Sequence, residues 1–263
     1  MTSRCILAIQ YQLVNDSPIL IAANREEFYD RVSHAPSIQS GKPRILCGID
    51  QQAGGTWLGV NQNGMFVAAS NRTKARPPIA ARSRGVLCRE LLRCTSSRQA
   101  LDQAQEELST GKYDGVNFVI ADQESAWAVH GGDELNAVEL EQGLSIIGNG
   151  DVNDSRDERV QLAYRLLTLQ TLDSPVKFLA VASKVFARSP SPPGRPTMIV
   201  RGRGWGTVSS TLISLGKKPR DAIYQFANGA PDQAKYEDFS PMLRDILSRG
   251  LREARARAKT ATT

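Results

Sequence analysis

The sequence predicts a single α+β domain. Of its 263 residues, 41% are hydrophobic and 23% are charged, which is typical of a soluble globular protein. The predicted elements run in the order strands, two helices, strands, two helices, strands and one final helix. Two sheets with helices packed outside them would bury the apolar faces of such a set. No internal repeat or clean linker interrupts the chain, which favours one domain over residues 1–263.

The first half of the chain begins with strand patterns and continues with two helices. We expect a pair of strands over the largely apolar residues 5–9 and 18–23, joined by a turn at residues 14–17. Further strands are predicted over residues 44–47, 56–60 and 65–69, with a hairpin loop over residues 61–64. Ser83 is expected to cap a helix ending near Cys94, and Ser96 or Ser97 a helix ending near Leu108.

The second half repeats the order of strands followed by helices. Strands are predicted over residues 116–121, 126–129, 136–140 and 144–147. Helices are predicted from Asp154 to about Gln170 and from Ser174 to about Arg188, where Pro175 suits a first helical position. Strands over residues 198–200, 207–215 and 222–226 follow, and Ser240 starts a terminal helix. Residues 248–263 are expected to form a basic helix end or tail.

Composition and charge narrow the classes of function. No apolar run approaches the roughly 20 residues of a membrane span, and no secretory signal is evident, so a cytoplasmic location is expected. Four cysteines and two histidines predict neither a disulfide scaffold nor a metal site. The net charge of +6 indicates an anionic partner, such as a lipid headgroup or a phosphate or carboxylate metabolite. Nucleic acid is not expected, because the basic clusters contain no interleaved aromatics. These clusters are Arg72, Lys74, Arg76, Arg82, Arg84, Arg89 and Arg93, and then Arg249, Arg252, Arg255, Arg257 and Lys259.

A run of four polar residues stands at the end of a strand predicted to be buried. Asn24, Arg25, Glu26 and Glu27 follow the apolar segment 19–23. Buried polar groups are costly unless they pair or hold a ligand, so the run is a candidate binding site. The alternative is a strand that ends in a solvated acidic turn. Asn71-Arg72, at the end of the predicted strand 65–69, is a second candidate because it would face the same rim if the strands are neighbours.

Several short motifs together resemble those of the NRDE family, also called the transport-and-Golgi-organisation protein 2 family. They are Ala23-Asn24-Arg25-Glu26-Glu27-Phe28, Gly48-Ile49-Asp50, Gly54-Gly55-Thr56-Trp57-Leu58-Gly59, Ser70-Asn71, Ser83-Arg84-Gly85, Tyr113-Asp114-Gly115-Val116-Asn117, Gly148-Asn149-Gly150 and Gly206-Thr207-Val208-Ser209-Ser210-Thr211. The family has Asp where this chain has Glu26, and Thr where it has Ser70. The resemblance covers roughly residues 5–215. It implies an αββα sandwich of two mainly antiparallel sheets, the fold of N-terminal-nucleophile hydrolases.

The same resemblance implies a possible catalytic site. In that class of hydrolase the first residue of the mature chain attacks an amide, and its own α-amino group acts as the base. Cys5 would be the nucleophile, Arg25 a site residue and Asn149 the donor to the oxyanion. Three departures count against catalysis: four residues precede Cys5 unless they are removed, Val208 stands where the family has Arg, and no histidine stands near Cys5 in sequence. The alternative is that Cys5 is a small buried core residue.

Two functions of different class follow from these observations. The resemblance implies intracellular binding or trafficking of an apolar anionic metabolite such as haem or an acyl-CoA, with Arg25 and Arg72 neutralising its acid groups. No cofactor is required by any motif; haem is a candidate ligand, whose axial contacts would come from Cys5, His34 or His130. The alternative function is an amidohydrolase that uses Cys5. The ligand, the protein partners and the oligomeric state are left open by the sequence.

Overall fold

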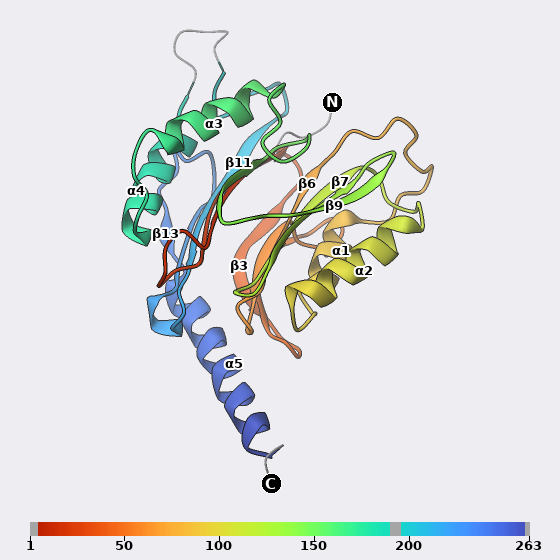
Figure 1. Ribbon diagram of the computed structural model, residues 1–263. Coiled ribbons are helices and arrows are strands. Elements are labelled where there is room, and N and C mark those ends of the chain that lie inside the picture. Colours follow the sequence, from red (N-terminus) through yellow and green to blue (C-terminus); the bar gives the residue numbers. More distant parts are fainter. Residues whose placement is uncertain (1–4, 190–195, 261–263) are drawn as a thin grey trace.

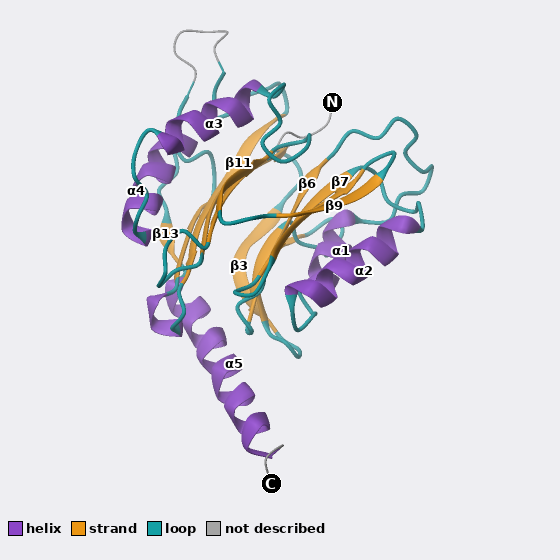
Figure 2. Ribbon diagram, in the orientation of Figure 1, coloured by secondary structure: helices purple, strands orange, loops and turns teal. Residues whose placement is uncertain are grey.

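The computed structural model describes residues 5–189 and 196–260. Two antiparallel sheets lie face to face, and helices cover their outer sides (Figures 1 and 2). Helices α3 (Glu158–Thr168) and α4 (Pro175–Phe186) lie on one side, and α1 (Arg84–Leu91) and α2 (Ser97–Ser109) on the other. The predicted αββα sandwich is therefore confirmed.

The first sheet has six strands in the order β10-β1-β2-β11-β12-β13. Its strands are β1 Ile6–Tyr11, β2 Ile19–Phe28, β10 Gly143–Ile147, β11 Trp205–Leu215, β12 Ile223–Ala227 and β13 Glu237–Asp238. The longest pairing joins β2 to β11, with Ala23 opposite Thr211 and Arg25 opposite Ser209, and its register shifts between Thr207 and Ser209. That β-bulge lies next to the candidate site residues, where bulges commonly re-aim side chains.

The second sheet has seven strands in the order β3-β4-β5-β6-β7-β8-β9. Its strands are β3 Ser33–Gln39, β4 Ile45–Asp50, β5 Leu58–Asn61, β6 Phe66–Asn71, β7 Val116–Ala121, β8 Ala126–Gly131 and β9 Leu135–Glu139. Neighbours in the sheet follow one another in the chain, so the sheet is a meander interrupted only by α1 and α2 between β6 and β7. This order brings the end of β6 beside the start of β7, with Asn71 opposite Val116.

Three apolar clusters correspond to the three spaces between the layers. The cluster between the sheets includes Ile21, Phe66 and Ile213; a second lies under α1 and α2, and a third under α3 and α4. Successive residues of β2 alternate between the first and third clusters, because side chains on a strand point to opposite faces in turn. The same alternation decides which polar residues at the end of β2 face the space between the sheets.

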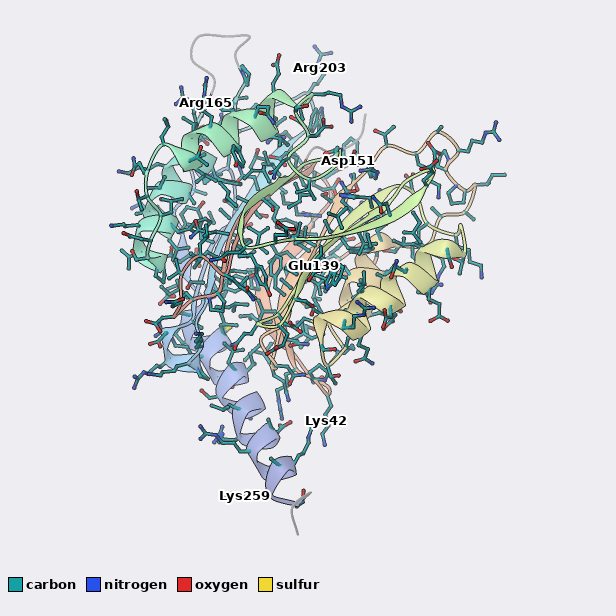
Figure 3. All side chains as sticks on the ribbon, viewed as in Figure 1. Lys42, Glu139, Asp151, Arg165, Arg203 and Lys259 are labelled. Carbon is teal, nitrogen blue, oxygen red and sulfur yellow. The ribbon has the colours of Figure 1, made fainter. Side chains whose placement is uncertain are left out.

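The helices begin where capping residues are available. Ser83, Ser96, Asp157 and Ser174 cap α1 to α4, and each side chain accepts a bond from a backbone N–H of the first turn. Helix α5 (Ser240–Thr260) includes the basic residues expected at the C-terminus, and it extends from the body with Lys259 near its far end (Figure 3). Within the described residues, no helix is long and apolar enough to cross a membrane.

One predicted strand does not form, one helix begins later than predicted, and two strands were not predicted. Residues 198–200 form no strand, because the N–H groups of Met198 and Ile199 bond to Arg188 O and that of Val200 bonds to the Thr207 side chain. Helix α3 begins at Glu158 rather than near Asp154. The missed strands are the exposed edge strand β3, which contains Pro36 near an irregularity, and the two-residue β13.

Candidate functional site

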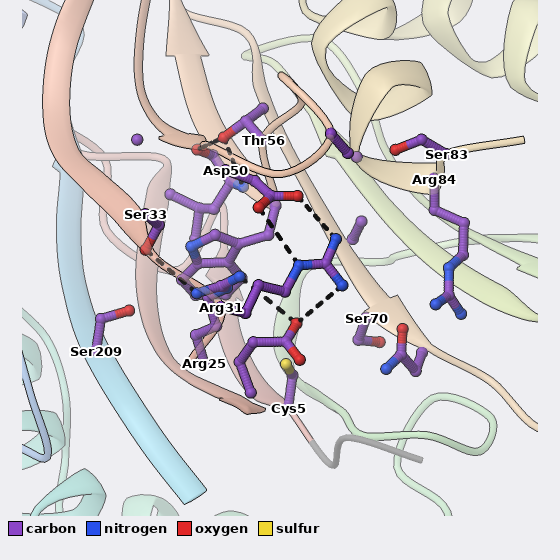
Figure 4. Close-up of a pocket in the computed structure, with 18 of the residues that line it drawn as sticks. Cys5, Arg25, Arg31, Ser33, Asp50, Thr56, Ser70, Ser83, Arg84 and Ser209 are labelled. Carbon is purple, nitrogen blue, oxygen red and sulfur yellow. Dashed lines mark hydrogen bonds and ion pairs between the residues drawn. The ribbon is translucent and has the colours of Figure 1, made fainter. Parts of the chain in front are cut away.

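A cavity of about 350 Å³ lies between the two sheets, at the end where β1 begins and β2 ends (Figure 4). The polar and charged residues that line it include Cys5, Arg25, Glu27, Arg31, Ser33, Asp50, Asn71, Arg82, Arg84 and Ser209. Its lining also includes the apolar or aromatic residues Trp57, Leu58, Val116, Tyr224 and Phe226. The volume lies at the lower end of the range of about 300–1,000 Å³ that is typical of ligand pockets.

The four polar residues at the end of β2 do not share one environment. Arg25 and Glu27 line the cavity, as predicted for a ligand site. Asn24 and Glu26 instead point to the opposite face of the sheet, under α3 and α4. The amide of Asn24 donates to Phe186 O at 2.9 Å and to Met198 O at 3.0 Å. The prediction that all four residues meet one ligand did not allow for the alternation of side chains along a strand.

An alternating row of charges crosses the polar wall of the cavity (Figure 4). Arg25 Nη2 lies 3.5 Å from Glu27, and Arg31 Nη1 lies 3.6 Å from the same carboxylate. Arg31 also makes two bonds to Asp50, at 3.3 Å from Nε and 2.7 Å from Nη2. Arg25 donates in addition to Ser33 Oγ at 3.3 Å. The two carboxylates are thus neutralised by the cavity's own arginines, and the row has no net charge.

Glu26 forms a buried ion pair on the far side of β2. Its Oε1 accepts from Arg159 Nη2 and from Thr207 Oγ1, both at 3.0 Å, and the side chain is fully buried. Burial raises the pKa of Glu26 to about 7, although Arg159 and Thr207 lower it. This carboxylate therefore supports the sheet from behind the cavity and does not meet a ligand within it.

Cys5 lies in the cavity wall directly before β1. Its Sγ contacts the backbone of Glu26, at 3.4 Å from the N–H and 3.6 Å from the carbonyl oxygen. The residue is 9% exposed, whereas Cys47 and Cys88 are fully buried. Cys5 and Arg25 both line the cavity. The prediction about removal of residues 1–4 concerns a segment outside the described residues.

Arg84 is the first residue of α1, and its guanidinium lies at the cavity (Figure 4). Its Nη1 donates to Gly115 O at 2.7 Å and lies 3.9 Å from Asp114 Oδ2. Burial lowers the pKa of Arg84 from its ordinary value, and the Asp114 carboxylate offsets this only in part. Arg84 was predicted only as one member of a basic cluster.

Asn149 lies on the loop after β10. Leu7 pairs with Ile147 in β1 and β10, and extending this register by two positions brings Asn149 opposite Cys5. The loop is clamped by the other sheet: Asn117 Nδ2 donates to Gly148 O at 3.2 Å and to Gly150 O at 2.9 Å, and Ser70 Oγ donates to Gly148 O at 2.9 Å. Asn149 itself is not among the cavity-lining residues.

Arg72 belongs to this clamp rather than to the cavity. Its guanidinium donates to Asn117 Oδ1 at 3.3 Å and to Asp151 Oδ1 at 2.6 Å. His130 Nδ1 lies 2.8 Å from the same Asn117 oxygen. Because Asn117 Nδ2 already donates to two carbonyls, Oδ1 must accept, so the neutral His130 carries its proton on Nδ1. The prediction that Arg72 faces the ligand rim with Asn71 is not supported by this geometry, since only Asn71 lines the cavity.

Most of the basic stretch after β6 also has structural partners. Lys74 donates to Tyr113 O, Arg89 to Gly54 O and Arg93 to Pro43 O. Arg82 pairs with Glu107 at 2.6 Å. These cations tie the loop to the sheet, and we therefore do not expect them to act together as a surface that attracts ligands.

Two glycine-containing motifs meet behind the cavity. A Cβ on Gly55 would lie 2.2 Å from the carbonyl carbon of Gly85, and Thr56 N–H donates to Gly85 O at 2.9 Å. Only a glycine allows the backbone of the β4–β5 loop to approach the start of α1 this closely. The contact fixes Trp57 and Arg84 relative to each other on the cavity wall.

Neither histidine is part of a metal site. His34 lines the cavity but bonds to Gln51 at the surface, and His130 is held in the Asn117 clamp. In the part of the chain that the structure describes, no group of three or more His, Cys, Asp or Glu could hold a metal ion. The arrangement instead offers arginine donors, a thiol and an apolar wall.

Sequence reasoning missed the roles of Arg31, Asp50 and Arg84. Arg31 follows the polar run within five residues of Glu27, but its partner Asp50 comes from the next hairpin. A signal existed in the motifs Gly48-Ile49-Asp50 and Ser83-Arg84-Gly85, which were recognised without a role. Val208, noted as a departure, lies in the β11 bulge and does not line the cavity, whereas Ser209 does.

The fold and the position of Cys5 define the class as an N-terminal-nucleophile-hydrolase-like sandwich. The chain superposes on the *Caenorhabditis elegans* N-acylethanolamine-hydrolyzing acid amidase ortholog with a TM-score of 0.54 and 15% identity, covering 80% of this chain and 92% of that one. Penicillin V acylase from *Agrobacterium tumefaciens* gives a TM-score of 0.50 and 12% identity over 85% of this chain and 83% of the other. At such identities the likeness shows the fold alone.

The sequence then identifies the family. The profile of the Transport and Golgi organisation 2 family matches residues 4–225, so the chain belongs to that family. The mouse Transport and Golgi organization 2 homolog is 36% identical over 108 residues, which are 40% of this chain and 38% of the mouse protein. The human homolog is 33% identical over 112 residues, 41% of this chain and 40% of that protein. The matched segment thus spans less than half the length of these relatives.

Proposed function

We propose that the chain binds a small apolar metabolite with an anionic group in the cavity between its sheets. The observation that carries this proposal is the mixed lining of the cavity, which contains arginines together with Trp57, Leu58 and Phe226. Ligand pockets commonly combine an apolar lining with a few well-placed polar groups. Acyl-CoA, lipid and haem are the candidate ligands, and the volume of about 350 Å³ suits one end of such a molecule.

The proposal is tested by filling the cavity. Titration calorimetry with palmitoyl-CoA and with haem should give saturable binding to the parent chain, and bound ligand should raise its unfolding temperature. Ser209→Phe places an aromatic ring in the cavity and should abolish that binding. Val208→Phe is the matched control, because its neighbouring position does not line the cavity. Equal binding by the parent and Ser209→Phe would contradict the proposal.

A second candidate function is hydrolysis of an amide by Cys5. It is favoured by the position of Cys5 in the cavity wall, which Arg25 also lines, and by Asn149 on the adjoining loop. The N-acylethanolamine-hydrolyzing acid amidase ortholog and penicillin V acylase, which share this fold, support the same idea. In this reaction the Cys5 sulfur attacks the carbonyl carbon, the amine leaves with a proton, and water then hydrolyses the thioester. The free α-amino group of Cys5 would act as base once residues 1–4 are removed.

Intact mass and one variant separate the two functions. A mature chain beginning at Cys5, together with release of amine from N-acyl substrates that is lost in Cys5→Ala, would establish the hydrolase. A chain that retains residues 1–4 and binds ligands without turnover would leave binding as its function. Either function would operate in the cytoplasm in this proposal, in keeping with four cysteines, all among the described residues, that form no disulfide.

A further inference from the structure

Four arginines line the cavity, and they differ in how fully their guanidinium groups are already engaged. Arg31 uses all three, with Nε and Nη2 on Asp50 and Nη1 near Glu27. Arg25 uses two, with Nη1 on Ser33 and Nη2 near Glu27. Arg84 uses only Nη1, which donates to Gly115 O. Arg82 uses Nη1 in a close ion pair with Glu107 at 2.6 Å, and its guanidinium lies over the Tyr113 ring. Among the described residues, Arg84 Nε and Nη2 have no hydrogen-bond or ion-pair partner, and its nearest carboxylate is 3.9 Å away, so Arg84 is the cavity arginine whose charge is least compensated.

The position of Arg84 at the start of α1 is unfavourable for a cation unless an anion lies beside it. It is the first residue of α1, and the N-terminus of a helix carries a partial positive charge. The first turn of α1 contains no acidic side chain, and Ser83 occupies the capping position with its hydroxyl on Val86 N–H. Asp114 lies 3.9 Å away and is 40% exposed, so it compensates the guanidinium only weakly. An oxyanion at this place would be stabilised by both the guanidinium and the helix.

The surrounding backbone holds this arrangement in place. Gly115 O orients Nη1 at 2.7 Å, and Gly85 O accepts from Thr56 N–H at 2.9 Å. Arg89, one turn further along α1, donates to Gly54 O at 2.6 Å and ties the helix to the same loop. A donor that is fixed before the ligand arrives loses little freedom on binding, which favours affinity.

We propose that Arg84 forms the anion subsite of the cavity and binds the carboxylate or phosphate of a ligand whose apolar body lies against Trp57 and Phe226. This inference rests on the proposed binding function and adds to it the chemical group and the residue that recognises it. Arg25 then mainly supports the charged wall. Carboxylate and phosphate share the oxyanion geometry that a guanidinium fork matches, and the other three arginines of the cavity each already lie within 3.5 Å of a carboxylate.

Three compounds with ten-carbon chains test the inference on the full-length chain: decanoate, decyl phosphate and the neutral decanamide. Calorimetry should show that Arg84→Gln weakens both oxyanions by about tenfold or more while decanamide changes by less than about twofold. The matched control is Arg98→Gln, which removes one exposed cation from α2, away from the cavity and its supports. It should leave all three affinities unchanged. The oxyanion that the parent binds more tightly identifies the natural headgroup.

Distinct results overturn the inference. If the parent binds the compounds and Arg84→Gln binds both oxyanions equally well, or loses decanamide to the same extent, the Arg84 subsite is wrong while the binding function stands. If the parent binds none of the three, the proposed function fails and the subsite fails with it. Should Arg84→Gln not fold, Arg84→Lys decides: it keeps the charge without the fork, and both oxyanions should bind several-fold more weakly than in the parent. Parent-like affinity in that variant would overturn the inference.

Discussion

Replacing Arg25 with Met tests how the charged wall of the cavity is supported. The Arg25 side chain is 6% exposed, and its loss would leave Glu27, 13% exposed, with a single arginine. Removing one partner of a buried ion pair costs about 3–5 kcal/mol when the other is left uncompensated. Here Glu27 keeps Arg31 at 3.6 Å, and its contact with Arg25 is long at 3.5 Å. We therefore expect Arg25→Met to lower the free energy of unfolding by a smaller amount, about 1–3 kcal/mol.

The assay is a double-mutant cycle by urea unfolding. The parent, Arg25→Met, Glu27→Gln and the double variant should give a coupling energy of about 0.5 kcal/mol or more between the two positions. Decanoate affinity should fall less in Arg25→Met than in Arg84→Gln. A coupling energy of zero would refute the structural role of the Arg25–Glu27 pair. An unchanged stability with a loss of affinity of about 2 kcal/mol would instead assign Arg25 as the direct contact of the anion.

Three further predictions concern the supports of the site. The folded-state pKa of Glu26, about 7, lies above the ordinary 4.5, so its contribution to stability is full below pH 4.5 and is lost as the pH rises to 7. The free energy of unfolding of the parent minus that of Glu26→Gln should fall over this window, and a flat or rising difference in urea titrations would contradict the raised pKa of Glu26. Gly55→Ala should destabilise by about 1–3 kcal/mol, because its Cβ would overlap backbone atoms. Gly85→Ala, whose Cβ meets Thr56 O at 3.1 Å, should cost less, and the reverse order of melting temperatures would refute the contact. Asn117→Leu leaves two loop carbonyls without their donor and should lower the free energy of unfolding by about 2 kcal/mol or more. Ser70→Ala removes one bond and should lower it by about 1 kcal/mol. Equal losses by chemical denaturation would show that Asn117 is not the main clamp.

The elements with strong local signals were predictable. Ser83 and Ser174 begin helices as expected, and the apolar runs 19–23 and 116–121 are buried strands. Strand β3 was not predictable, because it is an edge strand in which only Pro36 is buried. Its sequence therefore lacks the alternation of apolar and polar residues that marks a half-buried strand. The alternation on β2, by contrast, follows from the strand itself. It separates Arg25 and Glu27 from Asn24 and Glu26 without any knowledge of tertiary contacts.

The pairing of charges could not be derived from sequence. Arg31 meets Asp50 because β3 and β4 form a hairpin, and Arg84 meets Gly115 because α1 packs beside the start of β7. Arg72 was expected at the ligand rim from its position after Asn71, yet it turns towards Asn117 and Asp151. Which carboxylate or amide an arginine reaches depends on the register and packing of strands that are distant in the chain.

The central claim is that the cavity between the sheets holds an apolar anion. The most direct measurement is a crystal structure of the full-length chain with decanoate. We expect the carboxylate within hydrogen-bond distance of Arg84 Nε or Nη2, the alkyl chain against Trp57 and Phe226, and the Arg25–Glu27–Arg31 row retained. Decanoate bound elsewhere on the molecule, or a cavity that stays without ligand at saturating concentration, would contradict the account.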